Sequence, residues 1–153
     1  MDVETIERQL YIEADRATVY EVVSRPEHVR RWWPDDALYN PVPGSTGAIV
    51  FGDRDAGGVV ESFTVVDAEP PRMFSFRWKH PVGESATAHN SLLVTLTLAP
   101  SGSGTMLTLT ETGFLELCPD RAAAQDLHDR HETGWDLFLP RLVSYASKPE
   151  VQR

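Results

Sequence analysis

The sequence predicts an α+β domain in which a curved antiparallel sheet of about six or seven strands wraps around a long C-terminal helix. Two observations support this. Short segments with strand-like alternation fill the middle of the chain, and one long apolar stripe with helical spacing closes it. A helix with one apolar face needs a surface to pack against, and a sheet offers one. We expect this geometry to leave a cavity between helix and sheet.

The N-terminal part predicts one strand followed by two short helices. Residues 6–12 alternate between apolar and polar positions, which indicates the strand. Asp15 is expected to cap the first helix. Pro26 lies near the first position of the second helix. That helix is expected to end at Trp32 or Trp33, because a proline follows and limits its continuation.

The remaining strands are predicted between glycine- and proline-rich turns. They cover residues 48–51, 59–66, 73–78, 92–98 and 105–112, and a Ser-Gly turn joins the last two into a hairpin.

The final helix is predicted from a stripe that advances in steps of three or four residues and includes Leu127, His131, Trp135, Phe138, Leu142 and Tyr145. Asp120 is the expected N-cap. Pro140 is expected to kink the helix without breaking it, since the stripe keeps its phase. The tail is expected to fray from about residue 147.

Composition narrows the class of protein. The chain has 153 residues, 41% of them hydrophobic, which suits one globular domain over 1–153. Its net charge of −9 opposes nonspecific binding to nucleic acid or to anionic lipid. Cys118 is the single cysteine. No signal-peptide pattern and no apolar stretch of about 20 residues is found, so we expect a cytoplasmic protein without membrane insertion.

The order of elements, together with particular motifs, resembles the START-like (SRPBCC, helix-grip) superfamily. Within it, the chain is most similar to bacterial proteins resembling the activator of the ninety-kilodalton heat-shock chaperone's ATPase. The resemblance covers nearly the whole chain and rests on Ala14–Tyr20, Pro26-Glu27, Trp32-Trp33, Phe74-x-Phe76-x-Trp78, Gly104-Thr105 and His131-x-x-Gly134-Trp135.

This resemblance implies a helix-grip fold that often holds an apolar ligand between sheet and helix. Superfamily members include lipid carriers, polyketide cyclases and co-chaperone domains, so the resemblance identifies fold better than activity. The set of residues expected to line the cavity is Trp32, Trp33, Phe51, Phe63, Phe74, Phe76, Trp78, His131, Trp135 and Phe138. The alternative interpretation is that these rings simply fill the core.

His131 and Glu111 are the two candidates for acid–base chemistry. His131 falls within the apolar stripe, so it could hydrogen-bond a ligand oxygen or transfer a proton. Alternatively it is a core histidine bonded to a strand hydroxyl such as Thr108 or Thr110. Glu111 continues the inward alternation of its strand, although an exposed position at the strand end is an equal alternative.

No metal site and no cofactor are predicted. Within residues 128–132, two histidines lie three apart and do not form the His-Glu-x-x-His arrangement of zinc enzymes, so a solvated helix face is the preferred interpretation. His128 is expected towards the edge of the apolar stripe. Cys118 has no activating partner that the sequence reveals, and no nucleophile elbow occurs.

Three functions therefore remain. The leading hypothesis is a noncatalytic module that binds a small hydrophobic molecule. The second is a cyclase, dehydratase or hydrolase that uses the same cavity, with His131 and Glu111 converging in it. The third is a protein that interacts with a chaperone, which the family resemblance alone suggests. Homodimerisation through a sheet edge or the loops is left open.

Overall fold

The computed structural model describes residues 4–152, so residues 1–3 and 153 at the ends of the predicted domain lie outside it. The strands are β1 (Thr5–Ile12), β2 (Asp36–Leu38), β3 (Thr46–Phe51), β4 (Val59–Glu69), β5 (Met73–Trp78), β6 (Leu92–Ser101) and β7 (Gly104–Thr112). The helices are α1 (Arg16–Ser24), α2 (Pro26–Val29), the 3-10 turn η1 (Arg54–Ala56), α3 (Phe114–Leu117) and α4 (Arg121–Ala146).

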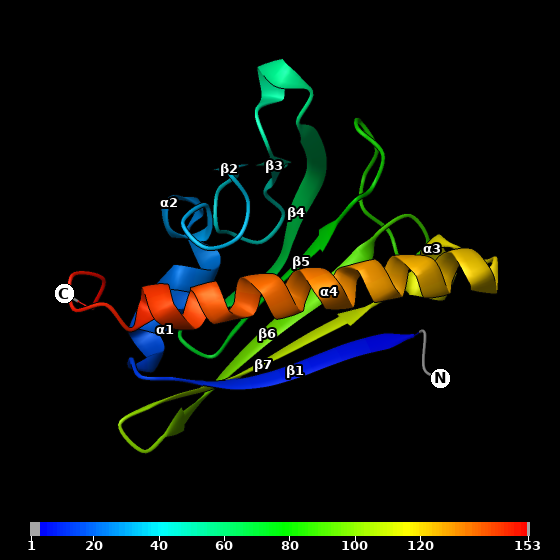
Figure 1. The fold of residues 1–153 in the computed structure, drawn as a ribbon. Coiled ribbons are helices and arrows are strands. Elements are labelled where there is room, and N and C mark those ends of the chain that lie inside the picture. Colours follow the sequence, from blue (N-terminus) through cyan, green and yellow to red (C-terminus); the bar gives the residue numbers. More distant parts are fainter. Residues whose placement is uncertain (1–3, 153) are drawn as a thin grey trace.

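The seven strands form one antiparallel sheet in the order β1-β7-β6-β5-β4-β3-β2. Helix α4 lies across one face of this sheet, and α1 and α2 gather near the C-terminal end of α4 (Figure 1). The α+β helix-grip architecture predicted from the sequence is thereby confirmed. None of the helices described in residues 4–152 is long and apolar enough to cross a membrane.

Alternate residues of the strands form the face of the sheet that α4 covers. Phe74, Phe76 and Trp78 are buried along β5. Leu107, Leu109 and Glu111 are buried along β7, with the residues between them only partly so. Because alternate residues of a strand point to the same face, Glu111 is carried inward with the two leucines. The alternative of an exposed Glu111 is therefore wrong.

The short helices begin where the sequence predicted. Asp15 accepts a hydrogen bond from the Thr18 amide at 2.8 Å and caps α1. Helix α2 ends at Val29, earlier than expected, and a hydrogen-bonded turn carries the chain on to Trp32 and Trp33. The indole N–H of Trp32 donates to the Val22 carbonyl at 3.0 Å, which fixes this turn against α1.

The C-terminal helix also begins as predicted, with Asp120 accepting a hydrogen bond from the Ala123 amide at 3.0 Å. It continues through Pro140 without a break and ends at Ala146. Beyond α4, the chain keeps contacts with the domain through Gln152. The Gln152 side-chain amide donates to the Glu13 carbonyl at 3.0 Å and to the Ala146 carbonyl at 3.2 Å, which ties the tail back to the domain.

Candidate ligand site

A buried carboxylate lies between the sheet and α4. Glu111 has no solvent-exposed surface. Its Oε2 accepts a hydrogen bond from Trp78 Nε1 at 2.8 Å. Its Oε1 accepts from Trp135 Nε1 at 2.8 Å and lies 2.9 Å from His131 Nδ1. Burying a carboxylate is costly unless hydrogen bonds satisfy it, and here three donors converge on its two oxygens.

Elements far apart in the sequence supply these four side chains. Trp78 ends β5, and Glu111 lies near the end of β7, with β6 between the two strands. His131 and Trp135 are four residues apart on α4, so their side chains project from the same face of the helix. The inward face of the sheet and the apolar stripe of the helix thus both carry polar atoms to one point.

With Glu111 ionised, both of its oxygens can only accept hydrogen bonds, and this selects one tautomer of His131. Both indole N–H groups can only donate, so an ionised Glu111 accepts from both and has capacity for a third donor. We therefore assign a hydrogen to His131 Nδ1, which leaves Nε2 as the acceptor nitrogen of the neutral ring. Within residues 4–152, Nε2 makes no hydrogen bond, and His131 keeps 10% of its side chain exposed.

A cavity of about 90 Å³ lies beside this cluster, and His131 forms part of its wall. Trp33 forms part of its wall, with ring centroids 5.1 Å from both Trp78 and Trp135. The complete lining is Trp33, Phe51, Trp78, Arg130, His131, Gly134, Trp135 and Phe138. The cavity is therefore an open pocket with mainly aromatic walls, to which His131 and Arg130 add polar side chains.

The predicted aromatic set divides into two groups. Six of its members line the cavity: Trp33, Phe51, Trp78, His131, Trp135 and Phe138. The other four, Trp32, Phe63, Phe74 and Phe76, pack within the core. Phe63, for example, stacks between Tyr39 and Phe76 at centroid distances of 4.4 and 4.3 Å. The void that Trp32, Phe63 and Phe76 help to line has a volume of only about 10 Å³.

The sequence did not predict Arg130 and Gly134 as lining residues. Both lie at the border of the helical stripe, and only the crossing of α4 over the sheet decides which border positions face the cavity. A Cβ built on Gly134 would have no heavy atom within 4 Å. Gly134 therefore leaves open space at the wall of the cavity, a role that a glycine in a helical pattern does not reveal by itself.

Larger pockets exist elsewhere on the domain. One, of about 570 Å³, is lined by residues of α1, α2 and the C-terminal part of the chain, including the pair His28 and Tyr145, whose Nδ1 and Oη atoms lie 2.7 Å apart. Two others have volumes of about 390 and 420 Å³. None of the three includes a residue of the Glu111 cluster. The smaller cavity is the better candidate because aromatic walls and a polar group converge there.

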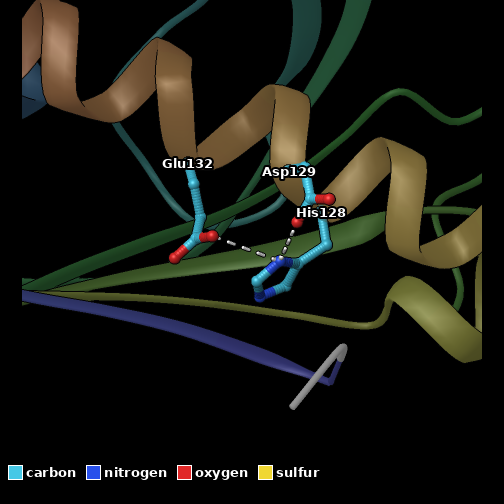
Figure 2. A group of neighbouring side chains, drawn as sticks. All are labelled: His128, Asp129 and Glu132. Atoms are coloured by element: carbon cyan, nitrogen blue, oxygen red, sulfur yellow. Dashed lines mark hydrogen bonds and ion pairs between the residues drawn. The ribbon is translucent and has the colours of Figure 1, made fainter. Parts of the chain in front are cut away.

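His128 differs from its expected position. Instead of lying on a solvated face, it is 4% exposed, and its Nε2 lies 3.1 Å from the Thr5 carbonyl oxygen. Asp129 and Glu132 approach its other ring nitrogen, as Figure 2 shows.

Comparison with known proteins agrees with this architecture. Residues 13–147 match the family model described as Activator of Hsp90 ATPase homolog 1-like protein. The chain belongs to this family. No functionally curated protein matches it.

Solved structures of low sequence identity share the fold. The crystal structure of protein CV1439 from Chromobacterium violaceum is 18% identical with a TM-score of 0.74, and the match covers 95% of this chain and 98% of that one. The solution structure of the Aha1 dimer from Colwellia psychrerythraea is 20% identical with a TM-score of 0.71, and the match covers 94% and 96%.

A further similar structure is that of DynU16, a putative protein in the dynemicin biosynthetic locus. It is 25% identical with a TM-score of 0.70, and the match covers 93% of this chain and 46% of that one.

Proposed function

We propose that this chain is a small-molecule binding module that holds an apolar or aromatic ligand in the cavity between the sheet and α4. The supporting observation is the aromatic pocket that His131 helps to line, because His131 Nε2 lacks a hydrogen-bond partner within the described residues. Aromatic walls favour a planar apolar body, and an acceptor nitrogen favours a hydroxyl group on it. The protein is expected to act in the cytoplasm.

The volume of the cavity restricts the ligand. A cavity of roughly 150 Å³ lined by apolar side chains holds benzene. The cavity here has about 90 Å³. A single-ring ligand therefore has to project through the mouth or displace Phe51 or Phe138, which are both only partly buried. We expect small ligands with one ring to enter and rigid polycyclic ligands to be excluded unless these side chains move.

Matched probes test this proposal. p-Cresol and toluene share a ring and a methyl group, but only p-cresol has a hydroxyl group to donate to His131 Nε2. Titrations followed by the indole N–H signals of Trp78 and Trp135 should show tighter binding of p-cresol. Equal affinity for the two would contradict the role of His131, and no response to either would contradict a ligand-binding cavity.

Substitution of Gly134 tests the location. Gly134→Leu should fill the mouth and weaken p-cresol binding at least tenfold, because open space surrounds the new Cβ and the side chain can occupy it. Ala122→Leu places the same side chain at an exposed position of α4 and serves as the matched control. Unchanged binding in Gly134→Leu would place any ligand elsewhere.

The Glu111–His131 contact favours acid–base catalysis as a second candidate function. A carboxylate that accepts from Nδ1 orients the imidazole and leaves Nε2 as a base, as in other carboxylate–histidine pairs. Such a base could remove a proton next to a carbonyl group in a pocket-bound substrate. Hydrogen–deuterium exchange of acetophenone methyl protons, followed by NMR, tests this. Exchange no faster than with His131→Gln would contradict it.

The family description also refers to a chaperone ATPase. The third candidate, interaction with a chaperone, would be supported by stimulation of the chaperone's ATPase in a direct assay. A homodimer is likewise a proposal, for which the dimeric Colwellia psychrerythraea structure provides the precedent. Light scattering of the purified chain distinguishes monomer from dimer.

A further inference from the structure

A second polar cluster lies on α4, on the side that faces β1. His128, Asp129 and Glu132 each offer one donor atom, and these atoms all lie within 4.8 Å of one another (Figure 2). We propose that these three residues form a binding site for a divalent transition metal ion, with Zn²⁺ as the reference ion. This proposal is independent of the proposed function, because it uses none of the residues that line the cavity.

The hydrogen of the neutral His128 ring lies on Nε2, which leaves Nδ1 free to bind a metal ion. Its Nε2 lies 3.1 Å from the Thr5 carbonyl oxygen, which can only accept a hydrogen bond, so Nε2 carries the hydrogen. In the neutral ring Nδ1 then has the lone pair. A histidine that binds a metal usually donates its other N–H to a carbonyl or a carboxylate, which fixes the ring for coordination. His128 is already held in that way, with 5% of its side chain exposed.

The distances around Nδ1 fit a metal better than a proton. Nδ1 lies 3.4 Å from Asp129 Oδ1 and 3.6 Å from Glu132 Oε1. A charge-assisted N–H···O bond spans about 2.7–2.9 Å. Ligand atoms at the corners of a Zn²⁺ tetrahedron lie about 3.3–3.6 Å apart, given Zn–N and Zn–O lengths of about 2.0–2.2 Å. The spacing from Nδ1 to both oxygens thus matches two edges of such a tetrahedron.

The surroundings leave carboxylate oxygens of Asp129 and Glu132 available to a metal ion. Arg8 donates to Glu132 Oε2 at 3.1 Å, so the metal would use the other oxygen of this carboxylate. Gln125 donates to Asp129 Oδ1 at 2.8 Å, and the metal would replace this bond or use the second oxygen. The Asp129 and Glu132 side chains are 57% and 38% exposed, which leaves room for a water as fourth ligand. The two negative charges of Asp129 and Glu132 exceed the one positive charge of Arg8, so the cluster attracts a cation.

Calorimetric titration of the full chain with Zn²⁺ in a non-chelating buffer tests the proposal. One ion per chain should bind, and Asp129→Asn and Glu132→Gln should each weaken binding at least tenfold. Both side chains are partly exposed, so these variants should fold, which circular dichroism verifies. Asp126→Asn is the matched control, because it removes the same charge from an exposed position on α4. It should bind Zn²⁺ as tightly as the unchanged chain.

Two further readouts separate a built site from general attraction of cations to an acidic protein. Co²⁺ should give the visible absorption of tetrahedral coordination, and Zn²⁺ should shift the ¹⁵N resonance of His128 Nδ1 more than that of Nε2. The absence of stoichiometric Zn²⁺ uptake would overturn the proposal. So would an equal loss of affinity in Asp126→Asn and Asp129→Asn, or a Zn²⁺ titration that leaves His128 unshifted.

Discussion

Replacing Glu111 by glutamine keeps the shape of the side chain and removes its charge, so it isolates the hydrogen-bonding role of the carboxylate. The amide offers one acceptor oxygen, whereas Trp78 and Trp135 place an indole N–H against different oxygens of the carboxylate. In either orientation of the amide, one indole N–H faces an NH₂ group and loses its acceptor. His131 can adapt by exchanging tautomers, but an indole cannot.

The expected magnitude follows from these contacts. A buried donor without a partner costs about 1–3 kcal/mol, and the remaining bonds lose the strength that charge gave them, about 1 kcal/mol each. Relief from burying a charge offsets part of this loss. We expect Glu111→Gln to lower the free energy of unfolding by about 2–4 kcal/mol.

Urea unfolding measures this change, with Glu116→Gln as a control at an exposed position of α3. The control should stay within about 0.5 kcal/mol of the unchanged chain. The indole N–H resonances of Trp78 and Trp135 should also move in Glu111→Gln. Stability within about 0.5 kcal/mol of the original, with both indole signals in place, would refute the reasoning.

Three other predictions concern single residues. Gly134→Ala should stabilise the chain by about 0.5–1 kcal/mol in urea unfolding, because Gly134 lies inside a helix with open space around its Cβ; destabilisation would mean that the space is not free. Burial raises the pKa of Tyr39 in the folded chain. The free energy of unfolding should therefore fall as pH rises above about 10, because the tyrosine ionises there in the unfolded chain. Tyr39→Phe should flatten that part of the pH profile. A hydrogen bond from Arg8 lowers the pKa of Asp136. The contribution of this pair to the stability of the fold should therefore be present above about pH 4 and disappear as pH falls through the lowered pKa. Carboxyl NMR titration should find a higher pKa for Asp136 in Arg8→Gln, and an unchanged value would rule out this pairing in solution.

The elements with long, regular patterns could be predicted from their period, and the short helices α1 and α2 from Asp15 and Pro26 at their starts, whereas β2 and α3 could not be predicted. β6 and β7 alternate over most of their length, and α4 keeps its apolar stripe through Pro140, so period alone identified them. β2 has three residues and α3 has four, too few to establish any period. Their positions depend on pairing with β3 and packing next to α4.

The candidate site shows the same limit. The alternation of β7 carries Glu111 to the inner face, and the stripe of α4 carries His131 to meet it. The expected partners of His131, Thr108 and Thr110, alternate with the inward leucines and therefore lie on the opposite face, which the pattern itself could have revealed. The convergence of Trp78 and Trp135 on one carboxylate depends on how helix and sheet cross, which no local pattern encodes.

The protonation of His131 tests the central claim most directly, because the proposed ligand contact depends on a ring fixed by Glu111. A long-range ¹H–¹⁵N NMR spectrum, recorded at a pH where the ring is neutral, distinguishes the two tautomers. The geometry predicts hydrogen on Nδ1 and a lone pair on Nε2 in the unchanged chain, and loss of this preference in Glu111→Gln. Hydrogen on Nε2 in the unchanged chain would contradict the account.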